Sequence, residues 1–124
     1  MGSQQDGSVR FRFRREMRLL RPAEFDRVFR EGRSASGRNV TVHVVANELG
    51  RARLGMAVAR AVGGAVARNR IRRLIREAFR LRQHDLPPGC DIVAVPRRTW
   101  NDPEMQRLGE ELVALVRQAL REPR

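Results

Sequence analysis

Residues 67–82 read Ala67-Arg68-Asn69-Arg70-Ile71-Arg72-Arg73-Leu74-Ile75-Arg76-Glu77-Ala78-Phe79-Arg80-Leu81-Arg82. Projected at about 100° per residue, this stretch has apolar residues on one side and arginines on the other, which is typical of a helix that lies on a core. The residues expected on the core side are Ala67, Ile71, Leu74, Ile75, Ala78, Phe79 and Leu81.

The other side of the expected helix is almost purely basic. Like charges three and four residues apart on a helix repel by a few tenths of a kcal/mol per pair. A merely solvated face usually mixes both signs, but Glu77 is the only acid in the stretch. The basic side comprises Asn69, Arg72, Arg73, Arg76 and Arg80, flanked by Arg68 and Arg70. This pattern favours a bound polyanion.

The start of the helix is a second feature suited to anions. It follows Val62-Gly63-Gly64, so the backbone N–H groups of its first turn lie beside Arg60, Arg68 and Arg70. Phosphate binds readily at the positive end of a helix dipole. We therefore interpret the helix as a nucleic-acid-binding element.

Composition agrees with this interpretation. The 124 residues fit one domain with a single core, and 26 Lys+Arg against 14 Asp+Glu give a net charge of +12, as in nucleic-acid binders. An anionic membrane is a weaker alternative because the apolar side of the helix is needed for the core. A single cysteine, Cys90, fits a reducing compartment. Without a transmembrane or signal segment, we expect a cytoplasmic protein.

The N-terminal residues are expected to differ from the rest. Residues 1–9 are small and polar and are predicted to be a disordered leader, with residues 10–124 forming a single RNA-binding domain. Residues 10–15 read Arg-Phe-Arg-Phe-Arg-Arg. They fit either a strand-like arm whose Phe11 and Phe13 pack inward, or a basic tail that touches RNA.

Local signals predict two further helices. Pro22 begins one that runs to about Glu31, with Gly32 as a left-handed residue after its end. The last helix is expected to have Asp102 as its cap and Pro103 at its first position. Its apolar stripe comprises Met105, Leu108, Leu112, Leu115, Val116, Ala119 and Leu120.

Strands are expected at 40–46, 53–59 and 91–95, and 33–38 is expected to be a polar loop. One sheet face is bulky, whereas the other carries small or polar residues such as Thr41, His43 and Gly55. That second face is either open to a nucleic-acid strand or simply poorly covered. Phe25 and Phe29 likewise fit either a core or an exposed platform for an unpaired base.

No catalytic apparatus is evident in the sequence. His43 lies in an expected strand and His84 in an expected loop, and no pairing of a histidine with a second base is evident. The acids lack metal-ligand spacing, and Gly63-Gly64 is a turn rather than a phosphate loop. The residues alone therefore indicate a nucleic-acid binder. A ribosomal or other structural RNA-binding protein, a DNA-binding regulator and a protein-only nuclease remain alternatives.

The sequence resembles the bacterial ribonuclease P protein subunit. The resemblance rests on residues 65–77, Ala-Val-Ala-Arg-Asn-Arg-Ile-Arg-Arg-Leu-Ile-Arg-Glu, whose Arg-Asn-Arg is that family's signature. It extends to Arg53-Leu54-Gly55 before the helix and Asp91-Ile92-Val93 after it, and covers about residues 18–120. Further agreement lies in Arg18-Leu19, Glu24-Phe25, Val28-Phe29 and Gly32.

The resemblance implies an α+β fold, a two-layer sandwich of a four-stranded sheet and three helices with a left-handed βαβ crossover. It also implies that the chain helps a catalytic RNA, with Mg²⁺ held mainly by that RNA, to remove the 5′ leader of precursor tRNA. No catalytic residue, metal site or organic cofactor is expected in the chain, nor a membrane or obligate protein partner.

The resemblance also implies site residues. Contacts to the catalytic RNA fall on Arg60, Arg68, Asn69, Arg70, Arg72, Arg73, Arg76 and Arg80, and contacts to the leader on Phe25, Phe29, His43 and Arg97. His43 stands where the family commonly has an aromatic residue. Ala59-Arg60-Ala61 and Gly64 replace a frequent Ser-Lys-Lys and Asn, so one cationic contact is missing.

Overall fold

The computed structural model describes residues 17–121. Its elements follow the order α2 (Pro22–Glu31), β1 (Arg33–Ser36), β2 (Val40–Ala46), β3 (Arg53–Met56), α3 (Ala65–Arg82), β4 (Cys90–Pro96) and α4 (Met105–Arg121), with 3-10 turns at Arg60–Val62 and Gln83–Asp85. The expected order of a helix, strands, a helix, a strand and a helix is confirmed. The expected leader and the 10–15 arm lie outside the described residues.

The four strands form one mixed sheet in the order β1-β2-β4-β3. β2 is antiparallel to both neighbours, with Val42 opposite Ala35 and Ala94. β3 and β4 are parallel, and α3 is the helical crossover that such a pair requires. The helix that carries the arginines therefore connects two strands that are neighbours in the sheet.

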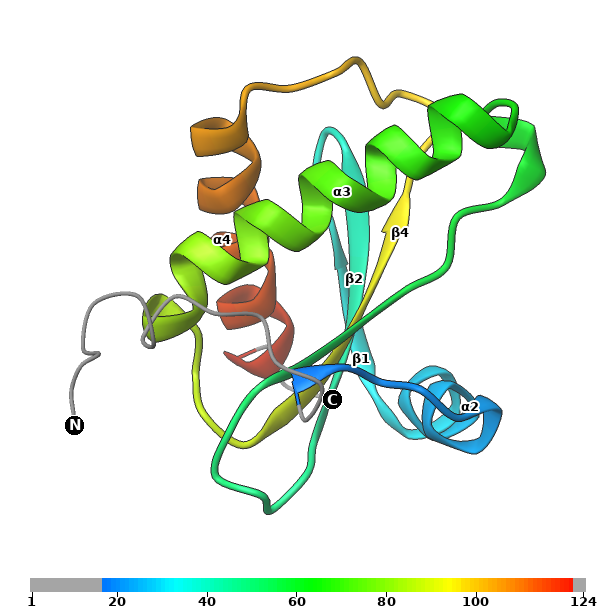
Figure 1. The fold of residues 1–124 in the computed structure, drawn as a ribbon. Coiled ribbons are helices and arrows are strands. Elements are labelled where there is room, and N and C mark those ends of the chain that lie inside the picture. The colour runs from blue at the N-terminus through cyan, green and yellow to red at the C-terminus, as the bar shows by residue number, and fades with distance from the viewer. Residues whose placement is uncertain (1–16, 122–124) are drawn as a thin grey trace, which may run out of the picture.

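Helices cover both faces of this sheet (Figure 1). α3 and α4 pack against each other and against the face formed by Val40, Val42, Val44, Leu54 and Ile92. α2 contacts β2 and β4 from the opposite face, where Leu19, Val28 and Val93 form a smaller buried cluster. The alternation of buried valines with the half-buried Thr41 and His43 along β2 thus separates the main core from the face that α2 partly covers.

The expected polar loop at 33–38 is wrong, because residues 33–36 form the edge strand β1. Ala35 is buried, whereas Ser34 and Ser36 are exposed. Gly32 is extended, with φ −85°, rather than left-handed. Glycine is needed at this position because any larger residue would clash with the backbone. A Cβ there would lie 2.5 Å from the Val28 carbonyl oxygen and 2.6 Å from the Val44 carbonyl oxygen.

Two element boundaries also differ from expectation. β3 ends at Met56, because the chain turns away from the sheet after the Ala57 amide donates to the Ala94 carbonyl at 3.1 Å. α4 begins at Met105, where the Leu108 amide donates to the Glu104 carbonyl at 2.9 Å. Asp102 is not its cap.

Three residues assigned to apolar stripes are exposed at helix ends. Ala67 lies in the first turn of α3 and Leu81, 42% exposed, in its last turn, while Leu120, 39% exposed, lies in the last turn of α4. The other residues assigned to these two stripes are buried or partly buried. The apolar periodicity correctly predicted which side of each helix faces the core. The core does not extend to the helix ends, so the stripe residues there are exposed.

Candidate nucleic-acid interface

The first turn of α3 leaves its end open to a ligand. The helix starts at Ala65 after its N-cap residue Gly64, which has no side chain to cap it. Its first backbone hydrogen bond runs from the Arg68 amide to the Gly64 carbonyl at 2.9 Å. A Cβ at Gly63 would lie 2.9 Å from that of Ala67, so glycine lets this turn pass close to the helix.

The arginines of α3 divide into two groups. Four bind a carboxylate or a backbone carbonyl: Arg70 contacts Asp102 at 3.1 Å, Arg80 contacts Glu77 at 2.8 Å, Arg82 contacts Asp85 at 3.0 Å, and the Arg68 Nε donates to the Gly63 carbonyl at 3.2 Å. Arg72 donates to the neutral Asn69 side chain at 3.1 Å. Within residues 17–121, Arg73 and Arg76 have no carboxylate within ion-pair distance. The pairs at Arg70 and Arg80 are solvent-accessible and therefore weak.

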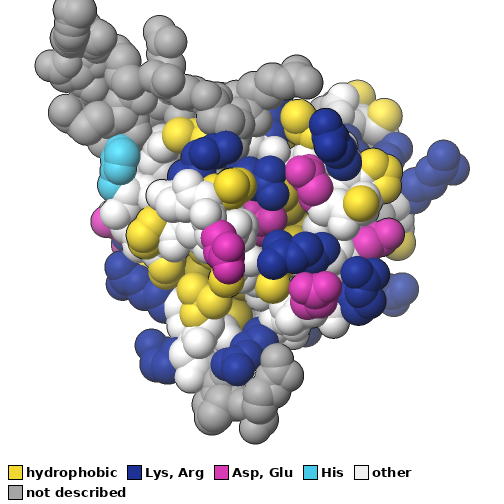
Figure 2. Space-filling view, turned by 90° about the horizontal axis from the view of Figure 1, so that it is seen from below, with side chains coloured by type: hydrophobic (Ala, Val, Ile, Leu, Met, Phe, Trp, Pro, Cys, Tyr) yellow, Lys and Arg dark blue, Asp and Glu magenta, His cyan; other side chains and the backbone are white. Residues whose placement is uncertain are grey.

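The basic surface is not uniform over the molecule. Figure 2, seen from below the view of Figure 1, shows arginines interspersed with acidic side chains on that face. Four of the described ion pairs involve α2 or its contact with Asp91. On α3, Arg72, Arg73 and Arg76 have no carboxylate within ion-pair distance among residues 17–121.

Two of the predicted leader-binding residues meet on the face of the sheet that α2 partly covers. Phe29 extends from α2 with 45% of its surface exposed, and its ring lies edge-on to the His43 ring, 4.8 Å between centroids and at 71°. Burial lowers the pKa of His43, which favours its neutral form at pH 7. We call the exposed Phe29 ring and the half-buried His43 ring, set edge to face, the Phe29–His43 platform. Flat side chains of this kind can stack unpaired bases.

Phe25 and Arg97 are placed differently. Phe25 is partly buried over Gly55, where a Cβ would lie 2.7 Å from its ring. It therefore fixes α2 on the sheet. Arg97 is exposed just beyond β4, and its Nη1 donates to the Gly37 carbonyl at 2.6 Å. Of the four leader candidates, only Phe29 and His43 are in ring contact.

The sequence reasoning missed the polar group that holds α2 in place. Asp91, 1% exposed, accepts two hydrogen bonds of 2.8 Å from Arg53 and one of 2.8 Å from Asn47. Arg53 also contacts Glu24 of α2 at 3.2 Å, and Glu24 accepts from the Leu20 and Arg21 amides. The sequence did contain a signal for this group, because Asp91 is an acid at the start of the otherwise apolar strand β4.

The ionisation of these two acids follows from their contacts. Burial acts to raise the pKa of Asp91, but hydrogen bonds from Arg53 and Asn47 and the positive charges of Arg53 and Arg27 outweigh it and lower the pKa. Backbone hydrogen bonding at Arg21 is the main cause that lowers the pKa of Glu24. Both groups are therefore ionised at neutral pH, as a structural network requires.

A second carboxylate joins α4 to the sheet. Glu111 accepts hydrogen bonds from the Asn39 amide and side chain, both at 2.7 Å, and from the Val40 amide at 3.1 Å. It thereby fixes the turn between β1 and β2. Among the described residues, no group of three or more His, Cys, Asp or Glu could hold a metal ion, and no helix in that part of the chain is long and apolar enough to cross a membrane.

Comparisons with known proteins agree with the geometry. A sequence model of the ribonuclease P family matches residues 13–120. The chain is 45% identical over 114 residues to the ribonuclease P protein component of Cronobacter sakazakii, covering 91% of this chain and 95% of the relative. It is 40% identical over 101 residues to that of Pelotomaculum thermopropionicum, covering 82% and 90%.

Solved structures give the same result. The ribonuclease P protein of Thermotoga maritima superposes with a TM-score of 0.74 at 31% identity, covering 82% of this chain and 96% of that one. That of Staphylococcus aureus gives 0.72 at 30% identity, covering 83% and 94%. With a sequence match along most of its length and the same fold, the chain belongs to the ribonuclease P protein family.

Proposed function

We propose that the chain binds two RNAs at once: the catalytic RNA of ribonuclease P through α3, and the 5′ leader of precursor tRNA through Phe29 and His43. The family forms the protein part of an RNA-based endoribonuclease that matures the 5′ end of tRNA. The observation that carries the proposal is the placement of the arginines of α3 and the Phe29–His43 platform on opposite faces of one sheet.

Arg73 and Arg76 favour α3 as the side that meets the catalytic RNA. Within the described chain neither has a carboxylate partner, and arginine binds phosphate through a planar fork that is always charged. Arg60, Arg68, Asn69, Arg70, Arg72 and Arg80 complete this proposed surface. The uncapped first turn offers a further phosphate position.

The Phe29–His43 platform fits a single strand rather than a duplex. Stacking on flat side chains requires bases that are not stacked on each other, and it tolerates any base sequence. Phe25 acts there through packing, since its ring holds α2 over Gly55. Arg97, beyond the end of β4, is proposed to contact a leader phosphate.

The proposed mechanism is electrostatic. The chain screens repulsion between two RNA backbones and holds the leader, while Mg²⁺ bound mainly by the RNA supports phosphodiester hydrolysis. No side chain of the protein serves as the general base. The protein acts in the cytoplasm, where precursor tRNA is made.

The test adds the purified chain to a bacterial ribonuclease P RNA at low Mg²⁺. The chain should restore leader removal that the RNA alone does not perform. The double variant Arg70→Ala, Arg73→Ala should lose most of this rescue, whereas Arg107→Ala, Arg121→Ala, which removes two exposed arginines from α4, should keep it. Equal loss in both variants would exclude a specific role for α3.

Phe29→Ala tests the leader surface. We expect binding of precursor tRNA by the holoenzyme to weaken by about 1–3 kcal/mol, the usual contribution of one stacked base, with mature tRNA unaffected. Leu49→Ala is the matched control because Leu49 is an exposed apolar residue of similar accessibility, 44% against 45%. Equal weakening of precursor and mature tRNA would contradict the assignment.

A further inference from the structure

A pocket of about 310 Å³ lies between α3 and the segment that leads into α4. One wall is a single stripe of α3 that includes Arg70, Arg73 and Leu74, since residues three and four apart are neighbours on a helix. The other wall includes Asp102 and Met105, and both Leu74 and Met105 are partly buried. The pocket therefore combines guanidinium groups with apolar surface.

The two guanidinium groups of this pocket are weakly compensated. Glu77 also lines the pocket, but its carboxylate contacts Arg80 at 2.8 Å, and within residues 17–121 Arg73 has no carboxylate within ion-pair distance. Arg70 contacts Asp102 at 3.1 Å with both side chains more than half exposed, and such a contact contributes little in water. An anion that enters the pocket can thus bind both guanidinium groups.

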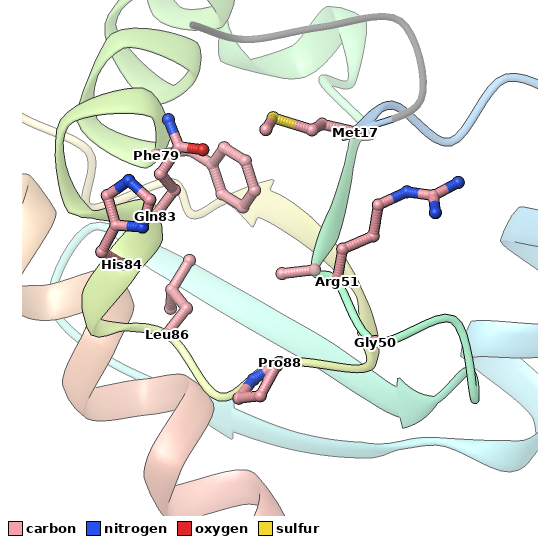
Figure 3. Close-up of a pocket in the computed structure, with 9 residues that line it drawn as sticks. Met17, Gly50, Arg51, Phe79, Gln83, His84, Leu86 and Pro88 are labelled. Atoms are coloured by element: carbon pink, nitrogen blue, oxygen red, sulfur yellow. The ribbon is translucent and has the colours of Figure 1, made fainter. Parts of the chain in front are cut away.

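The C-terminal end of α3 borders a pocket of a different character, with a volume of about 360 Å³. Figure 3 shows Phe79, from α3, and Leu86 directed into it. No arginine of α3 is among the described residues that line this second pocket. The combination of α3 guanidinium groups with an apolar wall therefore belongs to the pocket at Arg70 and Arg73.

We propose that the pocket at Arg70 and Arg73 receives one unpaired nucleotide of the catalytic RNA, with its phosphate on the two arginines and its base against Leu74 and Met105. The proposal rests on the proposed binding of that RNA through α3. A phosphate alone would leave the apolar wall unused, and an RNA duplex cannot enter a pocket of this size. A nucleotide supplies both an anion and a flat base, and proteins commonly recognise RNA through bases that are unpaired and turned outward.

Asp102 takes the position on Arg70 that the phosphate would occupy. Its Oδ2 contacts the Arg70 guanidinium at 3.1 Å, and its Oδ1 accepts a hydrogen bond of 3.3 Å from the indole nitrogen of Trp100. A phosphate that binds Arg70 repels this carboxylate and so changes the surroundings of Trp100. Because Trp100 is the only tryptophan in the chain, its fluorescence reports entry of the nucleotide.

Binding titrations with the catalytic RNA test the contact with the base. Met105→Ser removes apolar surface but no charge, so affinity should fall about threefold to tenfold while the salt slope of binding stays unchanged. Arg73→Ala should instead lower that slope by about one. Met105→Leu, which keeps the apolar surface, should bind like the wild type.

Leu120→Ser is the matched control, because it replaces another apolar residue, 39% exposed, at the opposite end of the same helix. It should bind like the wild type. Wild-type affinity in Met105→Ser, or an equal loss in Leu120→Ser, would overturn the nucleotide pocket. The loss expected in Arg70→Ala, Arg73→Ala would still support binding through α3, so the two proposals fail separately.

Trp100 fluorescence tests the pocket without the catalytic RNA. Adenosine 5′-monophosphate should change the emission of the wild-type chain at lower concentration than inorganic phosphate does at equal ionic strength, because only the nucleotide carries a base. In Met105→Ser the two anions should act alike. An equal response of the wild type to both anions, or no response to either, would overturn the inference. Since no catalytic RNA is present, this outcome is independent of the proposed function.

Discussion

At the scale of single residues, Phe25 and Phe29 show how neighbours decide a role. They are one turn apart on α2 and have the same side chain, yet Phe25 packs over a strand and Phe29 is exposed beside His43. Gly55 makes the difference, since a larger residue there would occupy the space of the Phe25 ring. The sequence predicted that both could be core or platform, but not which would be which.

For single residues, we predict the effect of replacing Asp91 on the stability of the fold. Asp91→Asn removes a buried negative charge that faces Arg53 and Arg27, and the loss of one partner of such a pair costs about 3–5 kcal/mol. We expect a corresponding decrease in the free energy of unfolding, measured by urea titration at pH 7. Thr41→Val, a nearly isosteric change on the neighbouring strand, should cost much less.

The pH dependence of stability gives a second measure of the same contact. The folded state lowers the pKa of Asp91, so the contact stabilises fully above the ordinary aspartate value of about 3.9. Its contribution is lost as the pH falls from there through the lower pKa of the folded state. The wild type should lose more stability than Asp91→Asn between pH 5 and pH 2, as estimated from the linkage relation for about one proton. Parallel curves would show that Asp91 is not the responsible group.

At the scale of elements, α3 carries both the core contacts and the arginines, and its own protein partly neutralises the arginines. Asp102 has φ 44°, a left-handed conformation, and contacts Arg70 at 3.1 Å with both side chains more than half exposed. If Arg70 binds the catalytic RNA as we propose, the carboxylate that was expected to cap α4 competes with an RNA phosphate for it. Local capping signals could not show this, because the contact joins residues 32 positions apart.

Asp102→Asn should therefore strengthen binding of the catalytic RNA. An exposed ion pair is worth about 0–1 kcal/mol, so we expect an increase in affinity of up to about fivefold at low salt. Glu48→Gln is the control: it makes the same change of charge in the turn between β2 and β3. A filter-binding titration in which both variants gain equally would indicate a general charge effect instead of release of Arg70.

At the scale of the whole molecule, the net charge of +12 is distributed unevenly. Ion pairs around α2 fasten that helix to the sheet, while α3 keeps arginines without carboxylate partners within residues 17–121. The sheet thus separates α3, the surface that we propose for the catalytic RNA, from the Phe29–His43 platform that we propose for the single-stranded leader.

Salt dependence tests the whole surface. If about six phosphates are neutralised, binding of the catalytic RNA should weaken roughly a thousandfold between 50 and 200 mM salt. Binding of a short single-stranded leader, held mainly by stacking, should weaken much less. A titration with a flat response for the catalytic RNA would contradict electrostatic binding through α3.

The basic helix, the order of the elements and the resemblance to a known family could be recognised from the residues alone, because periodicity and charge along one helix are local properties. The remaining features arise only in the packed fold. It made Gly32 a point of close contact with β2, turned 33–36 into an edge strand, buried Asp91 under α2 and placed Asp102 against Arg70. Each of these depends on which distant residue comes near, and that is fixed only when the strands and helices pack together.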